Sequence, residues 1–88
     1  MAERKVTVRN RHGLHARPAA MFVQRASSCP FGVTIEKGGK SADAKSILSI
    51  MAQAIRKGDE VVLKTGGDDL QAQEALDALS AILTDETA

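Results

Sequence analysis

The two adjacent glycines at positions 38 and 39 constrain the fold more than any other feature of this sequence. They lie in the stretch Lys37–Lys40, between the alternating apolar and polar residues of Phe31–Glu36 and a short segment from about Lys40 to Ala44. A Gly-Gly pair readily takes the positive φ angles that a tight two-residue hairpin turn requires. The sequence therefore predicts an antiparallel pair of strands in the middle of the chain.

The segments around this hairpin switch between the period of a strand and the period of a helix. Arg4–Asn10 and Glu60–Thr65 alternate as half-buried strands do. Three other segments carry apolar residues at helical spacing. The predicted buried stripes are Ala16, Ala19, Ala20, Val23 and Ala26 or Ser27 in the first, Ile47, Leu48, Met51, Ala54 and Ile55 in the second, and Ala72, Ala75, Leu76, Leu79, Ile82 and Leu83 in the third. The order βαββαβα predicts an α+β fold, a two-layer sandwich with helices covering one face of the sheet.

Local signals mark where the helices begin and end. Pro18 falls in the first turn of the first helix, because the amide that proline lacks has no intrahelical partner there, and His15 is then near the N-cap. Ser46 is the predicted N-cap of the second helix and Gly58 its end. The loop Gly66–Asp69 supplies the N-cap of the last helix and favourable negative charge.

Composition narrows the class of protein. Eighty-eight residues suit one domain covering 1–88. The net charge of +1 and the absence of Trp and Tyr disfavour nucleic-acid binding, which usually needs a basic excess and stacking aromatics. The single Cys29 has no partner for an internal disulfide, and no run approaches the ~20 apolar residues of a membrane span. We therefore expect a cytoplasmic chain with no membrane insertion.

The segment Gly13–Ala20 is the candidate chemical site. It places His15 where a loop becomes a helix and Arg17 two residues later. Unpaired amides at a helix N-terminus bind phosphate oxygens, and together with Arg17 they keep the imidazole neutral and nucleophilic. Phosphoryl transfer mainly requires positioning and electrostatics, both of which this segment offers. His12 and His15 lack a third ligand nearby, so we expect no metal site and no cofactor.

The second helix carries two features with alternative interpretations. Ser46 is a good structural cap, and it is also a place where an added phosphate would be tolerated electrostatically. Ile47, Leu48 and Met51 fit a buried core stripe, although part of the group could emerge beside the first helix as an apolar docking patch. From the residues alone, both alternatives stay open.

Two motifs resemble those of one known family. The stretch Gly13–Ala19 (GLHARPA) resembles the active-site signature of HPr, the histidine-containing phosphocarrier family of the bacterial phosphotransferase system, and Lys45–Met51 (KSILSIM) resembles its second motif. The resemblance implies an open-faced β-sandwich whose antiparallel sheet has the strand order 1-4-2-3. It also implies that His15 accepts a phosphoryl group on Nδ1 and that Arg17 stabilises the phosphate.

The same resemblance implies a set of partners. His15 would be charged by Enzyme I, itself charged by phosphoenolpyruvate, and would pass the group to Enzyme II A components for sugar uptake. Ser46 would be the regulatory site of an HPr kinase/phosphorylase, with a transcriptional regulator as a further partner. Ala20, Ile47, Leu48 and Met51 would form the docking surface. Such a protein is a stoichiometric carrier and not an enzyme, and we expect a monomer.

The sequence departs from the family pattern at three positions. His12 stands where a small hydroxyl residue or a similar one is common, and Leu48 and Ser49 replace a methionine and a glycine. The first change bears on the surroundings of the phosphate, and the other two bear on docking and on regulation through Ser46. These departures make transfer through His15 a firmer expectation than regulation through Ser46. Two alternative functions stay open beside it: a nitrogen-related phosphocarrier, because the family includes such carriers, and a mainly regulatory module that acts through Ser46.

Overall fold

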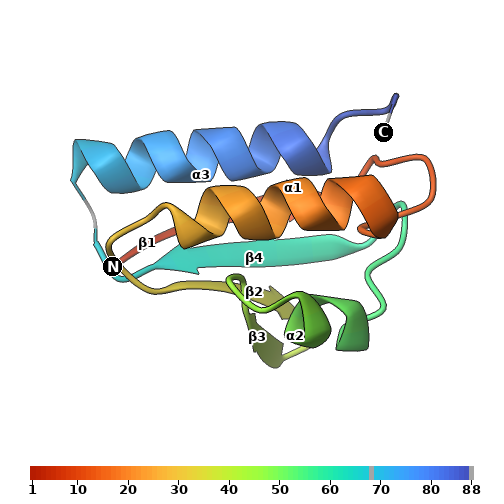
Figure 1. Cartoon of the computed structure of the whole chain (residues 1–88), viewed down its shortest axis with the longest axis horizontal. Coiled ribbons are helices and arrows are strands. Elements are labelled where there is room, and N and C mark those ends of the chain that lie inside the picture. The colour runs from red at the N-terminus through yellow and green to blue at the C-terminus, as the bar shows by residue number, and fades with distance from the viewer. Residues whose placement is uncertain (68, 88) are drawn as a thin grey trace.

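The computed structural model describes residues 1–67 and 69–87. Its elements, in chain order, are β1 (Ala2–Thr7), α1 (Ala16–Ser27), β2 (Val33–Lys37), β3 (Lys40–Asp43), α2 (Ile47–Ala52), β4 (Glu60–Thr65) and α3 (Leu70–Leu83). All strand pairs are antiparallel and the sheet has the order β1-β4-β2-β3 (Figure 1). The predicted α+β class, element order and strand order are therefore confirmed.

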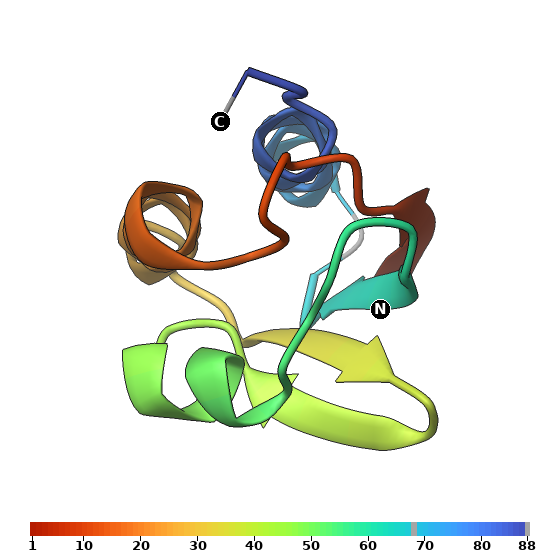
Figure 2. The same ribbon diagram turned by 90° about the vertical axis from the view of Figure 1, so that its right-hand side faces the viewer.

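The helices and the sheet form two layers. The central strand β4 pairs with β1 and β2, and the registers Val6 with Val61 and Ile35 with Leu63 align apolar residues across the sheet. Figures 1 and 2 show α1 and α3 side by side over one face of the sheet, with α2 close to β3. The start of α1 and the end of α3 lie at the same end of the molecule.

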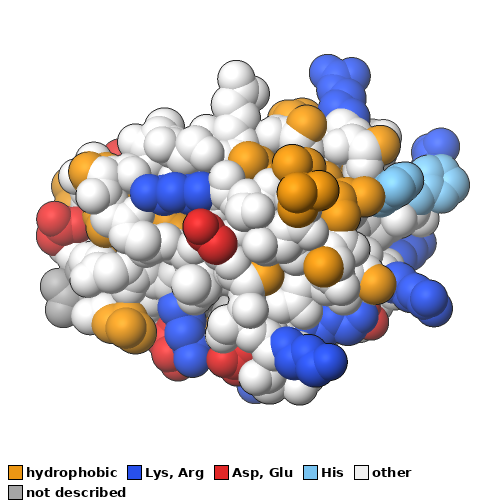
Figure 3. All heavy atoms as spheres, turned by 60° about the horizontal axis from the view of Figure 1, so that its bottom comes forward, with side chains coloured by type: hydrophobic (Ala, Val, Ile, Leu, Met, Phe, Trp, Pro, Cys, Tyr) orange, Lys and Arg blue, Asp and Glu red, His pale blue; other side chains and the backbone are white. Residues whose placement is uncertain are grey.

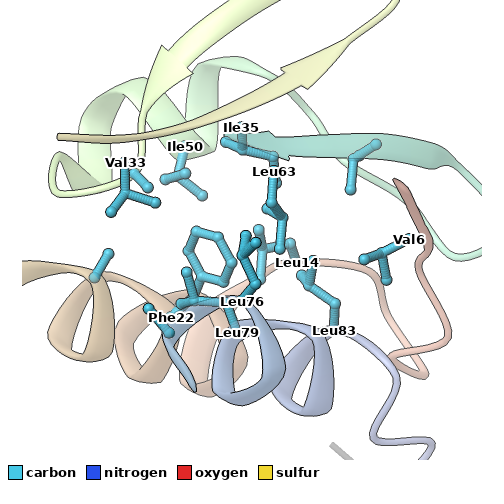
Figure 4. Close-up of a cluster of buried hydrophobic side chains, with 14 of the residues drawn as sticks. Val6, Leu14, Phe22, Val33, Ile35, Ile50, Leu63, Leu76, Leu79 and Leu83 are labelled. Carbon is cyan, nitrogen blue, oxygen red and sulfur yellow. The ribbon is translucent and has the colours of Figure 1, made fainter. Parts of the chain in front are cut away.

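Buried aliphatic side chains from both layers form the core. Leu63 and Ile35 from the sheet point towards Phe22, Leu76 and Leu79 from the helices (Figure 4). Burial of a large apolar side chain contributes about 1.5–3 kcal/mol, so this group dominates the stability of the fold. The cluster also holds Leu14, and the core therefore reaches the loop that precedes α1.

The predicted stripe of α1 was partly wrong. Ala19 and Ala26 are buried as expected and Val23 is half-buried, but Ala16 and Ala20 are exposed and Phe22 is fully buried. The physical reason is side-chain size. An alanine gains little from burial, so the orientation of the helix is set by the large phenylalanine ring, which the predicted stripe omitted.

The predicted second helix was too long. It ends at Ala52, Ala54 takes a left-handed φ of 50°, and Gly58 lies in a later turn with a φ of 92°. Ile50 is its buried residue, whereas Ile47, Leu48 and Met51 are exposed by 42%, 80% and 38%. Because the helix stops after fewer than two turns, Ile55 is buried from the following loop.

The ends of the strands differ from the predicted ends by a few residues, whereas the hairpin turn and the N-caps of the helices were predicted well. β1 stops at Thr7, three residues before the predicted end. Gly38 and Gly39 form the hairpin with φ angles of 57° and 83°. The Asp69 carboxylate caps α3 by accepting a hydrogen bond from the amide of Ala72 at 3.0 Å. Position 68, part of the same predicted cap, lies outside the described residues.

Candidate functional site

The loop between β1 and α1 is held from the side by a second loop, between α2 and β4. Val8 donates its amide hydrogen to Asp59 O at 2.8 Å, and Gly58 donates to Val8 O at 2.7 Å. Farther along, Leu14 donates to Ile55 O at 3.1 Å. These backbone bonds take over where the strand ladder ends, and they fix both ends of the loop that leads to His15.

Asn10 ties the same loop to the end of α3. Its side chain is fully buried, and its amide nitrogen Nδ2 donates to Ile82 O at 2.7 Å and to Asp85 O at 3.1 Å. Its own carbonyl accepts from the amide of Gly13 at 3.0 Å. Asn10 was not among the residues predicted to matter for the site, although it alternates in phase with the buried Val6 and Val8. That alternation was the signal that could have identified it.

Gly13 permits a close approach between the two loops. Its φ is 77°, and a Cβ added there would lie 2.5 Å from Ile55 O and 2.8 Å from Arg56 Cα. A residue with a side chain cannot occupy this position without moving backbone atoms. The glycine therefore allows Leu14 to enter the core and sets the direction in which the chain reaches His15.

His15 is the N-cap residue of α1. It is exposed, its backbone is extended with φ −141° and ψ 156°, and no side chain caps the helix there. Ala16 follows with a left-handed φ of 51°. Because the first amides of a helix have no intrahelical partner, this end offers hydrogen-bond donors and the positive end of the helix dipole beside the imidazole.

Arg17 is exposed in the first turn of α1. Together with Pro18, Met21, Asp85 and Thr87 it lines a surface hollow of about 370 Å³. Hydrogen bonds from the hydroxyl and the amide of Thr87 hold the pKa of Asp85 below its usual range, so that carboxylate is negative at neutral pH. The structure thus brings the C-terminal segment next to the arginine, which the sequence analysis did not anticipate.

Positive and apolar side chains gather around the histidines. Figure 3 shows the two histidine side chains together at one end of the molecule, with basic side chains near them and hydrophobic ones directly beside them. The exposed basic residues of the two loops are Arg9, Arg11, His12, Arg56 and Lys57. The exposed large hydrophobic residues of α1 and α2 are Met21, Ile47, Leu48 and Met51. This end can attract an anion and can also bury an apolar surface of a partner.

Ser46 caps α2 as predicted. Its Oγ accepts a hydrogen bond from the amide of Ser49 at 3.3 Å, and its carbonyl accepts from Ile50 at 3.0 Å. The residue is half-buried and is followed directly by the exposed Ile47 and Leu48. A charge placed on Ser46 would therefore stand at the margin of the apolar group.

A metal site and a membrane span were both expected to be absent. Within residues 1–67 and 69–87 no three His, Cys, Asp or Glu side chains come together as a metal site would require. No helix in the described part of the chain has the length and apolar character to cross a membrane.

Cys29 is buried, and its sulfur lies 3.5 Å from Nη1 of Arg25.

Comparison with known proteins identifies the family. The sequence profile described as "PTS HPr component phosphorylation site" matches residues 2–85. The chain belongs to the HPr family. HPr of Cupriavidus necator, a phosphocarrier protein, is 41% identical over 83 residues, which cover 94% of this chain and 91% of the relative. The crystal structure of HPr from Bacillus anthracis has a TM-score of 0.85 at 45% identity and covers 93% of this chain and 95% of its own.

A second kind of HPr relative is equally similar. The HPr-like protein Crh of Bacillus subtilis is 46% identical over 86 residues, which cover 98% of this chain and 99% of Crh. Crh was solved in crystals as a dimer with a swapping domain, and this structure has a TM-score of 0.72 at 45% identity over 100% of this chain and 99% of its own. The chain is therefore an HPr-family protein of the phosphotransferase system that resembles both phosphocarriers and Crh.

Proposed function

We propose that this chain is a phosphocarrier that accepts a phosphoryl group on Nδ1 of His15 from Enzyme I and passes it to Enzyme II A components. Enzyme I would first be charged by phosphoenolpyruvate. The single observation that carries the proposal is the position of His15, exposed at the uncapped N-terminus of α1 with Arg17 in the first turn. The chain would act stoichiometrically, and its partners would supply the turnover.

The local electrostatics suit the phosphorylated state of His15. Nδ1 of His15, which lies at the N-terminal amides of α1 and two residues before Arg17, would attack phosphorus as the nucleophile. The N–P bond forms as the donor's bond to phosphorus breaks. Afterwards the same amides and Arg17 stabilise the negative charge of the phosphoryl group. The phosphorylated product would thus be stabilised by positive groups that are already in place before the transfer.

Docking would use the apolar group beside the histidines. Ala20 on α1 and Ile47, Leu48 and Met51 on α2 are exposed, and Leu48 is exposed by 80%. Exposed apolar residues gathered in one place are typical of a protein–protein contact. Basic residues around this patch would favour partners with an acidic surface, since complementary charge raises the rate of encounter.

Ser46 would be the regulatory site of an HPr kinase/phosphorylase. A phosphate there adds a charge of about −1.5 to −2 at the N-terminus of a helix, where it is tolerated. Its position next to Ile47 and Leu48 would bring that charge to the edge of the docking surface. We therefore expect phosphorylated Ser46 to weaken binding to Enzyme I and to favour a different partner, a transcriptional regulator.

The main experiment is phosphorylation with Enzyme I and phosphoenolpyruvate, followed by phosphorus NMR. The expected product is an acid-labile phosphohistidine with the shift of an Nδ1 adduct. His15→Ala should abolish it, whereas His12→Ala, which removes the neighbouring exposed histidine, should still be labelled. Labelling of His15→Ala at the rate of the parent would refute the proposal.

The resemblance to Crh supports a second candidate function, a mainly regulatory module that acts through Ser46. It would give acid-stable phosphate from ATP and an HPr kinase, and tighter binding to a transcriptional regulator afterwards. Failure of Enzyme I to label His15, together with efficient labelling of Ser46, would favour this function.

Three narrower expectations accompany these functions. A nitrogen-related branch of the system would be identified by the Enzyme II A component that accepts phosphate most rapidly. The monomer expected from the sequence stays a prediction, and analytical ultracentrifugation tests it against the dimer of Crh. The cytoplasmic location also stays a prediction, and cell fractionation tests it.

A further inference from the structure

Lys37, the last residue of β2, makes more contacts than its half-exposed position suggests. Its ammonium Nζ donates to Ala54 O at 2.9 Å and to Gln53 O at 3.3 Å. It also forms an ion pair with Oδ2 of Asp59 at 2.9 Å. One side chain from the sheet therefore contacts both ends of the loop that runs from α2 to β4.

The two carbonyls lie at the C-cap of α2 and at the residue that follows it, where no further helical turn supplies an amide to them. Gln53 is the C-cap residue, and Ala54 turns the chain out of the helix through a left-handed φ of 50°. A left-handed alanine is strained by roughly 1–2 kcal/mol. A cation at a helix C-terminus stabilises the last carbonyls and interacts favourably with the dipole. Lys37 therefore holds a backbone conformation that glycine would normally provide.

Asp59 fixes the other end of the loop. Oδ2 accepts a hydrogen bond from the amide of Arg56 at 2.8 Å, and Asp59 N donates to Arg56 O at 3.0 Å. The hydrogen bond from the Arg56 amide, followed by the one from Lys37, lowers the pKa of Asp59, so its carboxylate is ionised at neutral pH. The turn of residues 56–59 is thus closed by one carboxylate that Lys37 also contacts.

The loop held in this way is the support for the segment that leads to His15. Leu14 donates to Ile55 O, and backbone atoms of Ile55 and Arg56 lie 2.5 and 2.8 Å from the position that a Cβ on Gly13 would take. His15 is the next residue after Leu14. A shift of the loop by a few tenths of an ångström would therefore move the imidazole relative to the amides of α1.

We infer that Lys37 is a positioning residue for His15, acting through the loop of residues 53–59. The inference rests on the proposed phosphorylation of His15. Lys37 touches neither the imidazole nor a phosphoryl group. Its role is to keep the supporting loop in the one arrangement in which His15 lies at the uncapped end of α1.

The chain contains a matched control for this inference. Lys64 also forms an ion pair with a carboxylate, that of Glu36 at 3.4 Å, and the two pairs have almost equal side-chain exposure, 31% and 29% against 32% and 28%. Exposed ion pairs contribute about 0–1 kcal/mol each. A general effect of losing a lysine ion pair should therefore be the same at both positions, whereas an effect on His15 should appear only at position 37.

The experiment compares Lys37→Met, Lys37→Arg, Lys64→Met and the parent in two phosphorylation reactions. The first uses Enzyme I and phosphoenolpyruvate, and kcat and KM are measured against carrier concentration. The second uses phosphoramidate, a small phosphoryl donor that requires no partner. Rates are compared at a temperature at which circular dichroism finds every variant folded. Asp59→Asn, which removes the carboxylate but leaves the lysine, serves as a second test if Lys37→Met does not fold.

Lys37→Met should lower kcat and the phosphoramidate rate about three- to tenfold, because small displacements of a reacting group are costly, while KM stays within twofold. Lys37→Arg should restore most of the rate, Lys64→Met should react as the parent does, and Asp59→Asn should lie between Lys37→Met and the parent. Equal rates for Lys37→Met and Lys64→Met would overturn the inference. If Enzyme I fails to label the parent but phosphoramidate labelling of His15 still slows in Lys37→Met, the proposed function fails while the positioning role of Lys37 stands.

Discussion

The loop of residues 8–15, here called the histidine loop, connects β1 to α1 and ends at His15. Gly13→Ala is the substitution that tests most directly how this loop is supported. The new Cβ would lie 2.5 Å from Ile55 O and 2.8 Å from Arg56 Cα, distances that real Cβ atoms essentially never show. Both of these are backbone atoms, so no side chain can rotate away to relieve the collision. The neighbouring hydrogen bond from Leu14 to Ile55 O would lengthen as the two loops separate.

The expected magnitude has two parts. A left-handed backbone costs an alanine about 1–2 kcal/mol, and forcing an extra carbon into a packed contact typically costs about 1–3 kcal/mol more. Gly13→Ala should therefore lower the free energy of unfolding by about 2–5 kcal/mol, which for a chain of this size lowers Tm by at least about 8 °C. Phosphorylation of His15 should slow as well, because the residue lies beyond the displaced segment.

Gly39→Ala isolates the collision from the backbone strain. Gly39 has a φ of 83°, close to the 77° of Gly13, but a Cβ there would meet nothing within 4 Å. Gly39→Ala should therefore lower the free energy of unfolding only by the cost of the left-handed backbone, about 1–2 kcal/mol. Urea unfolding followed by circular dichroism suits this chain, which has no Trp or Tyr. Equal losses of stability in the two variants would refute the close approach of the loops.

Three further substitutions test other parts of the structure. Asn10→Ala removes a buried amide with two hydrogen bonds and should lower the free energy of unfolding by about 1–3 kcal/mol, measured in urea. Because the pKa of Asp59 is lowered on folding, its contribution to stability is present above the unfolded pKa of about 4 and is lost as the pH falls through the folded pKa. In Asp59→Asn the free energy of unfolding should therefore fall less steeply as the pH is lowered below about 4. Leu48→Ser, at a side chain that is 80% exposed, should change stability by less than about 0.5 kcal/mol but weaken binding to Enzyme I.

Each of these has a control or an opposing result. Leu70→Ser changes a side chain that is 74% exposed on α3 and should leave Enzyme I binding unchanged, so equal weakening by both leucine variants would argue against docking at Leu48. If the free energy of unfolding of Asp59→Asn falls with acidic pH as steeply as that of the parent, the contacts of Lys37 and Arg56 with the Asp59 carboxylate are contradicted. Unchanged stability in Asn10→Ala would mean that the amide does not connect the loop to α3.

Much of the fold could be predicted because its signals are local. The hairpin at Gly38 and Gly39, the cap at Ser46 and the start of α1 beside Pro18 each depend on neighbouring residues alone. The end of α2 depended on distant ones. Lys37 comes from β2 to meet the carbonyls of Gln53 and Ala54, and no window around the helix contains that information.

In the candidate site, too, the local features could be predicted from the sequence and the contacts between distant residues could not. His15 and Arg17 stand in one short motif, so both their positions and the chemistry expected of them could be read from the sequence. The contacts that shape the loop join residues far apart in the chain, such as Asn10 with Ile82. Side-chain periodicity could indicate that Asn10 is buried, but it could not indicate which carbonyls would receive its amide.

The connections of the histidine loop also bear on how the protein is made. On the ribosome, His15 emerges before Ile55 and Ile82, whose carbonyls hold the loop. A nascent chain therefore carries the histidine in an unshaped segment until Ile82 has been translated. Unfinished or truncated chains would then compete poorly with finished ones for the same partner enzymes, although they contain the complete histidine motif.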